Sequence, residues 1–157
     1  MSLISGIKNS YLIDDTYNAS PDSVTAALAV LGELDVSEKK IAVLGDMKEL
    51  GDKNDEGHRK AGQDVAAAAD LLVAVGDSAR IIADEAAQSG MSTDKIFKFH
   101  DAVEAGKSIQ NDILQEGDLV LVKGSQAMRM EKIVKEIRAE PLRAGELLAR
   151  QEEYWQR

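Results

Sequence analysis

Residues 11–23 read Tyr11-Leu-Ile-Asp-Asp-Thr-Tyr-Asn-Ala-Ser-Pro-Asp-Ser23, and the rest of the chain repeats their pattern. Its apolar beginning suits a short buried strand, and polar residues then mark a turn. Ser20 is a favourable helix N-cap, and Pro21 stands at the first helical position, where its missing N–H is tolerated. The stretch therefore predicts a β-strand that passes through one turn directly into an α-helix.

Four later segments repeat this order of apolar strand, polar turn and helical apolar spacing. The expected strands, including the first, are 11–13, 39–45, 71–75, 96–99 and 118–122. Strands that alternate with helices in this way are typical of parallel sheets. The sequence therefore predicts an α/β protein with a three-layer, doubly wound, mainly parallel sheet and helices on both faces.

The length of 157 residues fits one domain, since domains usually have roughly 100–200 residues. We expect the domain to span residues 5–140. Residues 1–4 are expected to be added or linker residues outside it. Residues 141–157 carry Leu142, Leu147 and Trp155 and are expected to form a C-terminal helical tail.

Composition excludes several classes of function. The net charge of −9 argues against nucleic-acid binding, which needs a basic surface. The absence of cysteine excludes disulfides and thiolate metal sites. No apolar run approaches the ~20 residues of a membrane span, and the first residues do not begin a signal peptide. We therefore expect a cytoplasmic protein with no nucleic-acid partner and no membrane insertion.

The turn after the first strand contains the best candidate binding residues. Asp15, Tyr17 and Asn18 have no evident packing role there. Parallel α/β sheets bind ligands where their strands end and their helices begin, because free N–H groups and side chains meet at that edge. A solvated turn whose acids merely start a helix remains the alternative.

Other motifs are weaker. Ala105-Gly-Lys-Ser108 resembles the end of a phosphate-binding P-loop, but position 101 is aspartate where the motif needs glycine. The glycine pattern typical of dinucleotide binding is also missing. His58 falls on the apolar face of a predicted helix without a histidine partner at helical spacing, so we interpret it as a core-edge residue. The sequence predicts no triphosphate cradle and no self-contained nucleophilic site.

A phosphoacceptor receiver domain is a competing interpretation from another class. Such domains carry an acidic pair, an aspartate and a lysine at strand ends, and Asp14, Asp15, Asp77 and Lys123 follow that order. The separation of Asp15 from Asp77 is longer than in that family, and glycine follows the lysine where receivers have proline. This interpretation, or another stand-alone nucleotide-binding module, remains the alternative.

Three segments together carry a more specific resemblance. They are Ile13-Asp-Asp-Thr-Tyr-Asn-Ala-Ser-Pro-Asp-Ser23, Val43-Leu-Gly-Asp-Met-Lys-Glu-Leu-Gly51 and Val122-Lys-Gly-Ser-Gln-Ala-Met128. In this order, and each at an expected strand end, they resemble the C-terminal domain of the Mur ligases, specifically of the MurF type. The resemblance covers residues 5–140 and implies a Rossmann-like fold.

The resemblance implies a domain of an ATP-dependent amide ligase that adds D-Ala-D-Ala to UDP-N-acetylmuramoyl-tripeptide in peptidoglycan synthesis. ATP and Mg²⁺ would be held mainly by a central domain that this sequence lacks. The implied partners are therefore the N-terminal and central Mur ligase domains together with both substrates. The domain would close over ATP and the dipeptide and would be inactive alone, with no catalytic residue or metal ligand of its own.

The resemblance also implies roles for individual residues. Asp15 would accept hydrogen bonds from the ribose hydroxyls of ATP, and Tyr17 and Asn18 would border the adenosine. A carboxylate suits a diol because it offers acceptors for both hydroxyl donors.

A second set of residues would form the substrate-side loops. Lys123, Gly124 and Ser125 would face the reacting end of the substrate, and the loop that contains Asp46 would line the same side. The family usually has arginine at the position of Gln126, so no ion pair is expected from that residue.

Overall fold

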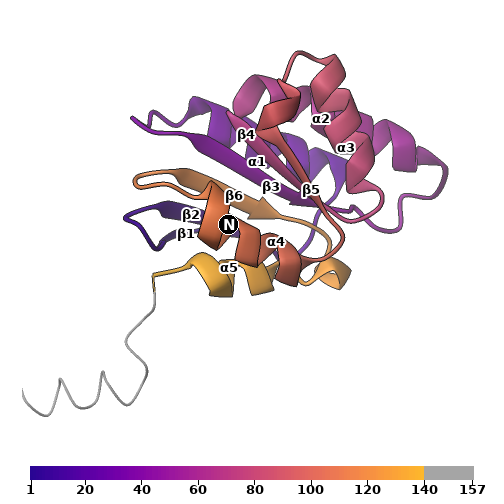
Figure 1. The fold of residues 1–157 in the computed structure, drawn as a ribbon. Coiled ribbons are helices and arrows are strands. Elements are labelled where there is room, and N and C mark those ends of the chain that lie inside the picture. Colours follow the sequence, from indigo (N-terminus) through magenta and orange to yellow (C-terminus); the bar gives the residue numbers. More distant parts are fainter. Residues whose placement is uncertain (140–157) are drawn as a thin grey trace, which may run out of the picture.

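The computed structural model describes residues 1–139, which form one six-stranded sheet with the order β1-β2-β6-β3-β4-β5 (Figure 1). The strands are β1 (Ser2–Ser5), β2 (Tyr11–Asp15), β3 (Lys40–Gly45), β4 (Leu71–Val75), β5 (Ile96–Phe99) and β6 (Leu119–Lys123). β2 to β6 pair in parallel, and β1 is antiparallel to β2. All five strands predicted from sequence are present, while the tail expected at 141–157 lies outside the described residues.

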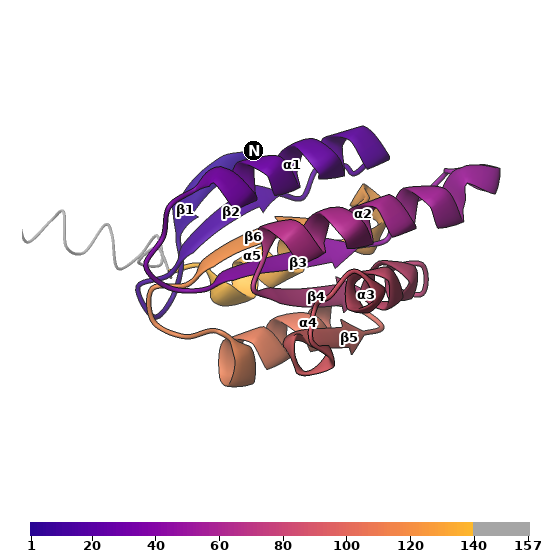
Figure 2. The ribbon, with the colours of Figure 1, turned by 90° about the horizontal axis from the view of Figure 1, so that it is seen from above.

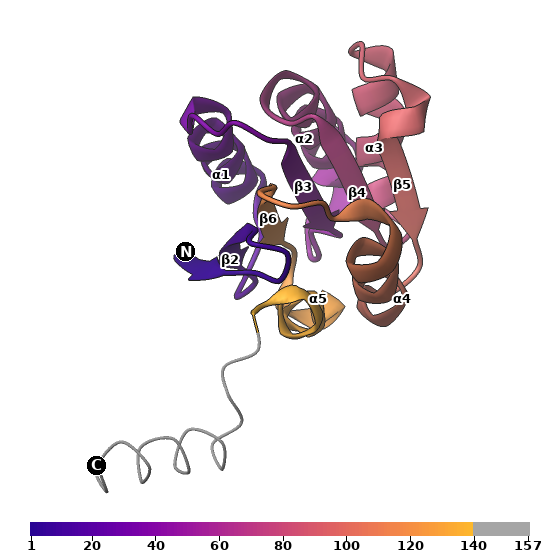
Figure 3. The ribbon, with the colours of Figure 1, turned by 60° about the vertical axis from the view of Figure 1, so that its left-hand side comes forward.

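Helices cover both faces of the sheet, as the sequence predicted. The α-helices are α1 (Pro21–Glu33), α2 (Asn54–Ala68), α3 (Ala79–Gln88), α4 (Ala102–Ser108) and α5 (Glu131–Ile137). Figures 1 and 3 show α1, α2 and α3 on one face and α4 and α5 on the other, and Figure 2 shows α1, α2 and α3 side by side. The shorter helical turns are η1 (Gly51–Lys53), η2 (Thr93–Lys95), η3 (Ile109–Ile113) and η4 (Gln126–Met128).

The core lies in two layers, one on each side of the sheet. Successive strand residues point to opposite faces, so Ile13 packs with α1 to α3 while Leu12 packs with α4 and α5. β3, β4 and β6 have almost no exposed side chains. This two-sided burial explains why the strands read as continuous apolar runs rather than as alternating ones.

β1 corrects the expectation that residues 1–4 are a linker outside the fold. Ser2–Ser5 pair with β2 through a tight connection in which Lys8 and Asn9 have positive φ. The connection is also bound to the end of α5, because the N–H of Ile7 donates to the carbonyl of Ile137 at 2.8 Å. The segment is short and largely exposed, and it therefore lacks the apolar pattern that marks a buried strand.

The strand order excludes the receiver interpretation. In the flavodoxin-type sheet of receivers, the first parallel strand lies between the second and the third. Here β6 lies between β2 and β3. Two strands, β6 and β3, therefore separate β4 from β2. Asp77, which follows β4, is therefore distant from Asp15 at the end of β2. The chain order suited a receiver, but the spatial order does not.

The helix starts follow the local sequence signals. The Ser20 side chain accepts a hydrogen bond from the N–H of Ser23 at 3.2 Å, and the Ser23 hydroxyl accepts one from the N–H of Ser20 at 2.9 Å. This reciprocal capping box confirms Ser20 as the N-cap of α1.

Residues 105–108 lie inside α4, as expected for a chance likeness to a P-loop. No helix in residues 1–139 is long and apolar enough to cross a membrane.

His58 is fully buried on α2, which confirms its interpretation as a core-edge residue. Its Nε2 accepts a hydrogen bond from the N–H of Met47 at 3.0 Å. Its Nδ1 lies 2.7 Å from the carbonyl oxygen of Asn54, which fits a neutral ring protonated at Nδ1. The imidazole therefore holds the loop after β3 against the start of α2.

We expect Gly62→Ala to destabilise the protein by about 1–3 kcal/mol, because α2 and α3 are in close contact there. A Cβ at Gly62 would lie 2.6 Å from both Glu85 Cβ and the Ile82 carbonyl oxygen. The matched control is Gly32→Ala in α1, where the new Cβ would lie 3.5 Å from Ala68 and the change should be neutral or slightly stabilising. Urea unfolding measures both, and equal stabilities would contradict this packing.

We expect His58→Leu to lower the free energy of unfolding by about 1–3 kcal/mol, because it leaves the buried N–H of Met47 without an acceptor. Urea unfolding at pH 7 is the measurement. His100→Leu is the control: His100 is exposed, and its replacement should change stability by less than about 0.5 kcal/mol. A His58→Leu variant as stable as the unmodified protein would show that the imidazole does not hold this loop.

Candidate functional site

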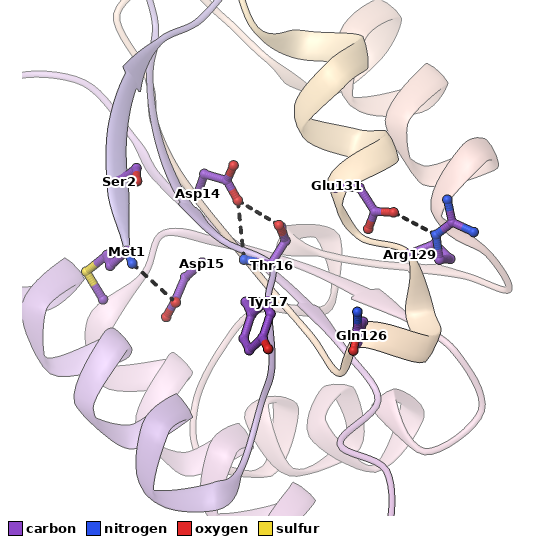
Figure 4. A pocket seen from close by; sticks show the side chains of 9 residues that line it. All are labelled: Met1, Ser2, Asp14, Asp15, Thr16, Tyr17, Gln126, Arg129 and Glu131. Atoms are coloured by element: carbon purple, nitrogen blue, oxygen red, sulfur yellow. Dashed lines mark hydrogen bonds and ion pairs between the residues drawn. The ribbon is translucent and has the colours of Figure 1, made fainter.

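A cavity of about 650 Å³ opens at the carboxyl edge of the sheet, beside the end of β2 (Figure 4). Residues of β1, the end of β2 and the segment around η4 meet there. The lining residues are Met1, Ser2, Asp14, Asp15, Thr16, Tyr17, Gln126, Arg129 and Glu131. The cavity thus lies at the edge where the sequence predicted ligand binding.

The two acids that end β2 serve different purposes. Asp14 closes the turn: its Oδ1 accepts hydrogen bonds from the Thr16 hydroxyl at 2.7 Å and from the Thr16 N–H at 3.3 Å. Asp15 points to the opposite face, as the strand alternation requires. Its Oδ2 accepts a hydrogen bond from the Lys123 ammonium at 2.8 Å. Asp15 is thereby held in place while its carboxylate still lines the cavity.

Tyr17 and Asn18 follow in the loop between β2 and α1, residues 16–20, called here the β2 loop. Tyr17 is 82% exposed and flanks the cavity, which leaves its ring free to stack against a ligand. Asn18 contributes its carbonyl oxygen, which accepts a second hydrogen bond from Lys123 at 2.9 Å. Asn18 is absent from the lining of this cavity, so its observed contact is structural.

Arg129 and Glu131 form the opposite wall of the cavity. The Arg129 Nε donates to Glu131 Oε1 at 2.6 Å, and this hydrogen bond lowers the pKa of the Glu131 carboxyl below its ordinary value. Arg129 has a left-handed backbone with φ of 55°, which is uncommon for a residue other than glycine. Gln126 begins η4 on the same wall. This wall of the cavity thus contains a guanidinium group, from Arg129, and an amide group, from Gln126.

Asp46 is buried and acts as a structural anchor. It begins the loop after β3, residues 46–50, called here the β3 loop. Its Oδ1 accepts a hydrogen bond from the N–H of Ala79 at 2.7 Å, at the start of α3. Its Oδ2 pairs with the Lys48 ammonium at 3.1 Å. Both carboxylate oxygens are thus already bound to groups of this chain.

Gly124 and Ser125 connect β6 to the β3 loop. The Ser125 N–H donates to the carbonyl of Asp46 at 3.0 Å, and the Ser125 hydroxyl accepts from the N–H of Lys48 at 2.7 Å. A Cβ at Gly124 would lie 2.7 Å from Met130 Cγ and 3.1 Å from Gly45 Cα. Glycine is therefore needed here for the close approach of two strand ends.

The predicted site residues fall into two groups. Asp15 and Tyr17 line the cavity. Asp46, Lys123 and Ser125 are instead nearly inaccessible, with exposures of 2%, 2% and 5%. Their polar atoms bind neighbouring loops of this chain. The role toward the substrate that the resemblance implies for them stays a prediction. Sequence reasoning missed five residues of the cavity wall, namely Met1, Ser2, Thr16, Arg129 and Glu131. No local signal marks Arg129 and Glu131, because they lie beyond the motif after β6.

The site offers hydrogen-bond acceptors, one guanidinium and one exposed aromatic ring. That set suits a ligand with hydroxyl donors and a flat ring system. The residues that the structure describes contain no group of three or more histidine, cysteine or acidic side chains able to hold a metal ion. Within residues 1–139, the side chains therefore do not fit a resident Mg²⁺.

Comparison with known proteins identifies the family of the chain. The family described as Mur ligase, glutamate ligase domain, matches residues 1–126. The UDP-N-acetylmuramoyl-tripeptide–D-alanyl-D-alanine ligase of Bacillus subtilis is 33% identical over 132 residues, which cover 83% of this chain and 28% of the relative. The enzyme of the same name from Haemophilus influenzae is 37% identical over 128 residues, which cover 80% of this chain and 27% of the relative.

Solved structures give the same result. The MurF ligase of Thermotoga maritima in complex with ADP superposes with a TM-score of 0.68 at 28% identity, over 86% of this chain and 29% of that one. MurF of Acinetobacter baumannii superposes with a TM-score of 0.69 at 32% identity, over the same shares. This chain thus spans less than a third of the length of these relatives. The chain therefore belongs to the Mur ligase family and carries the C-terminal domain of its MurF type.

Proposed function

We propose that this domain closes over nucleotide and substrate in an ATP-dependent amide ligase that adds D-Ala-D-Ala to UDP-N-acetylmuramoyl-tripeptide. The names of the relatives from B. subtilis and H. influenzae support this substrate pair. The ADP in the T. maritima relative supports a nucleotide as ligand. The reaction would take place in the cytoplasm, as part of peptidoglycan synthesis.

One observation carries the proposal: a fixed carboxylate and an exposed aromatic ring share one cavity at the end of β2. The Asp15 carboxylate would accept hydrogen bonds from the two ribose hydroxyls of ATP. The Tyr17 ring, 82% exposed beside it, would lie along the adenine. Asn18 would border the adenosine and shape the turn through its carbonyl.

The β3 loop and residues 124–125 would form the wall toward the substrate. Asp46 and Ser125 contribute by fixing that wall, since their polar atoms are bound to Ala79 and Lys48. Gly124 contributes by letting the ends of β3 and β6 approach closely. A rigid wall supports catalysis by orienting the dipeptide, whose amine must approach an activated carboxyl group in one geometry.

Mg²⁺ and the triphosphate would be held by the central domain of the ligase. The described residues lack an acidic cluster suited to the metal. Position 101 is aspartate where a P-loop needs glycine, and residues 105–108 lie within α4. When bound, the metal would neutralise charge on the phosphates. The residues of this chain would bind the nucleoside and exclude water.

We expect the 157-residue chain alone to form no amide bond between the two substrates, because the phosphate cradle lies in another domain. The measurement is ATP-dependent ligation of D-Ala-D-Ala with the isolated chain, and with the longer ligase as positive control. Turnover by the isolated chain would contradict the proposed division of labour between domains.

In the longer ligase, we expect Asp15→Asn to raise the KM for ATP and lower kcat/KM by roughly tenfold or more, since charged hydrogen bonds contribute about 1.5–3 kcal/mol. Asparagine is preferable to alanine because its amide oxygen still accepts from Lys123. Asp112→Asn, at an exposed position in η3, is the control. Unchanged ATP kinetics in a folded Asp15→Asn enzyme would favour the view that Asp15 is only part of a solvated turn.

A further inference from the structure

The Lys123 ammonium is buried at the carboxyl edge of the sheet, with 2% of the residue exposed. It ends β6, directly opposite Asp15 in the parallel register with β2. Its Nζ donates to Asp15 Oδ2 at 2.8 Å and to the carbonyl oxygen of Asn18 at 2.9 Å. These acceptors stand 108 and 105 residues earlier in the chain, so the contact exists only in the folded sheet.

This environment commits the ammonium to the β2 loop. A buried charge is costly unless it is paired and hydrogen-bonded, and moving Lys123 toward a substrate would give up both bonds. An ammonium has three donors, and two of them are used here. Lys123 therefore acts on groups of its own chain.

The same strand end also reaches the opposite loop. Two residues after Lys123, Ser125 binds the carbonyl of Asp46 and the N–H of Lys48. One short segment thus fixes the β2 loop on one side and the β3 loop on the other. A displacement of Lys123 would first break its hydrogen bonds to Asp15 and Asn18.

We propose that Lys123 is a positioning residue for nucleotide binding, which holds the Asp15 carboxylate and the β2 loop in the geometry that the nucleoside requires. Lys123 does not touch the reacting atoms. The inference rests on the proposed function, because it assigns the nucleoside to the cavity beside Asp15. It assigns Lys123 to the affinity for ATP and not to the chemical step.

The first test needs no ligand. In the 157-residue chain, Lys123→Met keeps the aliphatic stem and removes both hydrogen bonds. The Ala19 amide is attached to the Asn18 carbonyl that Lys123 binds, so its NMR chemical shift should change, while those of amides at the far ends of α2 and α3 stay unchanged. Lys135→Met, at an exposed position on α5, is the matched control and should leave Ala19 unaffected. An unaltered Ala19 signal in Lys123→Met would overturn the proposal.

The second test uses the longer ligase. Lys123→Met should raise the KM for ATP by about tenfold, the equivalent of about 1.4 kcal/mol, while kcat at saturating ATP and the KM for D-Ala-D-Ala change by less than about twofold. A loss of kcat with an unchanged KM for ATP would overturn the proposal in favour of contact with the reacting groups. Lys135→Met should again have no effect.

The third test is a double-mutant cycle with Asp15→Asn. If Lys123 acts through Asp15, the double variant should have a KM for ATP close to that of Asp15→Asn alone. Independent, multiplying effects would overturn the proposal. The double variant also leaves no charge of this pair buried alone, so it can be measured even where Lys123→Met fails to fold. If Asp15→Asn leaves the KM for ATP unchanged but Lys123→Met shifts the Ala19 amide, the proposed function fails while the positioning contact stands.

Discussion

The parallel pairing of β2 with β6 is the constraint on which the rest of the site depends. It sets Asp15 opposite Lys123, at a separation that lets carboxylate and ammonium form a hydrogen bond of 2.8 Å. Asp15 and Lys123 are the last residues of β2 and β6. The burial of Lys123 stabilises one arrangement of the β2 loop, since any other would leave the ammonium without an acceptor.

Buried polar side chains also connect the loops at this edge to one another. Asp46, Ser125 and His58 each bind backbone groups of a neighbouring segment, so the β3 loop is tied to β6, α2 and α3 at once. In the wall of the cavity, the Asp15 carboxylate is paired with Lys123 at 2.8 Å and with the N-terminal ammonium of Met1 at 3.8 Å. Under the proposed function, such tethering would keep the ordering cost of ligand binding low.

Much of the fold was predictable because its signals are local. Apolar runs, the Ser20 cap and helical spacing each depend on a few neighbouring residues, and all five parallel strands appeared where expected. β1 was missed because four largely exposed residues carry no apolar pattern. The insertion of β6 between β2 and β3 was also beyond the sequence, since chain order does not state which strands become neighbours.

From the amino-acid sequence alone, we could tell which residue types lie at the carboxyl edge of the sheet, and the three motifs pointed to the family. The contacts that each of these residues makes follow only from the folded arrangement. Asp15 and Tyr17 face the cavity, whereas Lys123, Asp46 and Ser125 are turned inward to hold the loops. The physical reason is that the role of a charged or polar side chain depends on burial and on its partner, and the partners of Lys123 stand more than a hundred residues away in the chain.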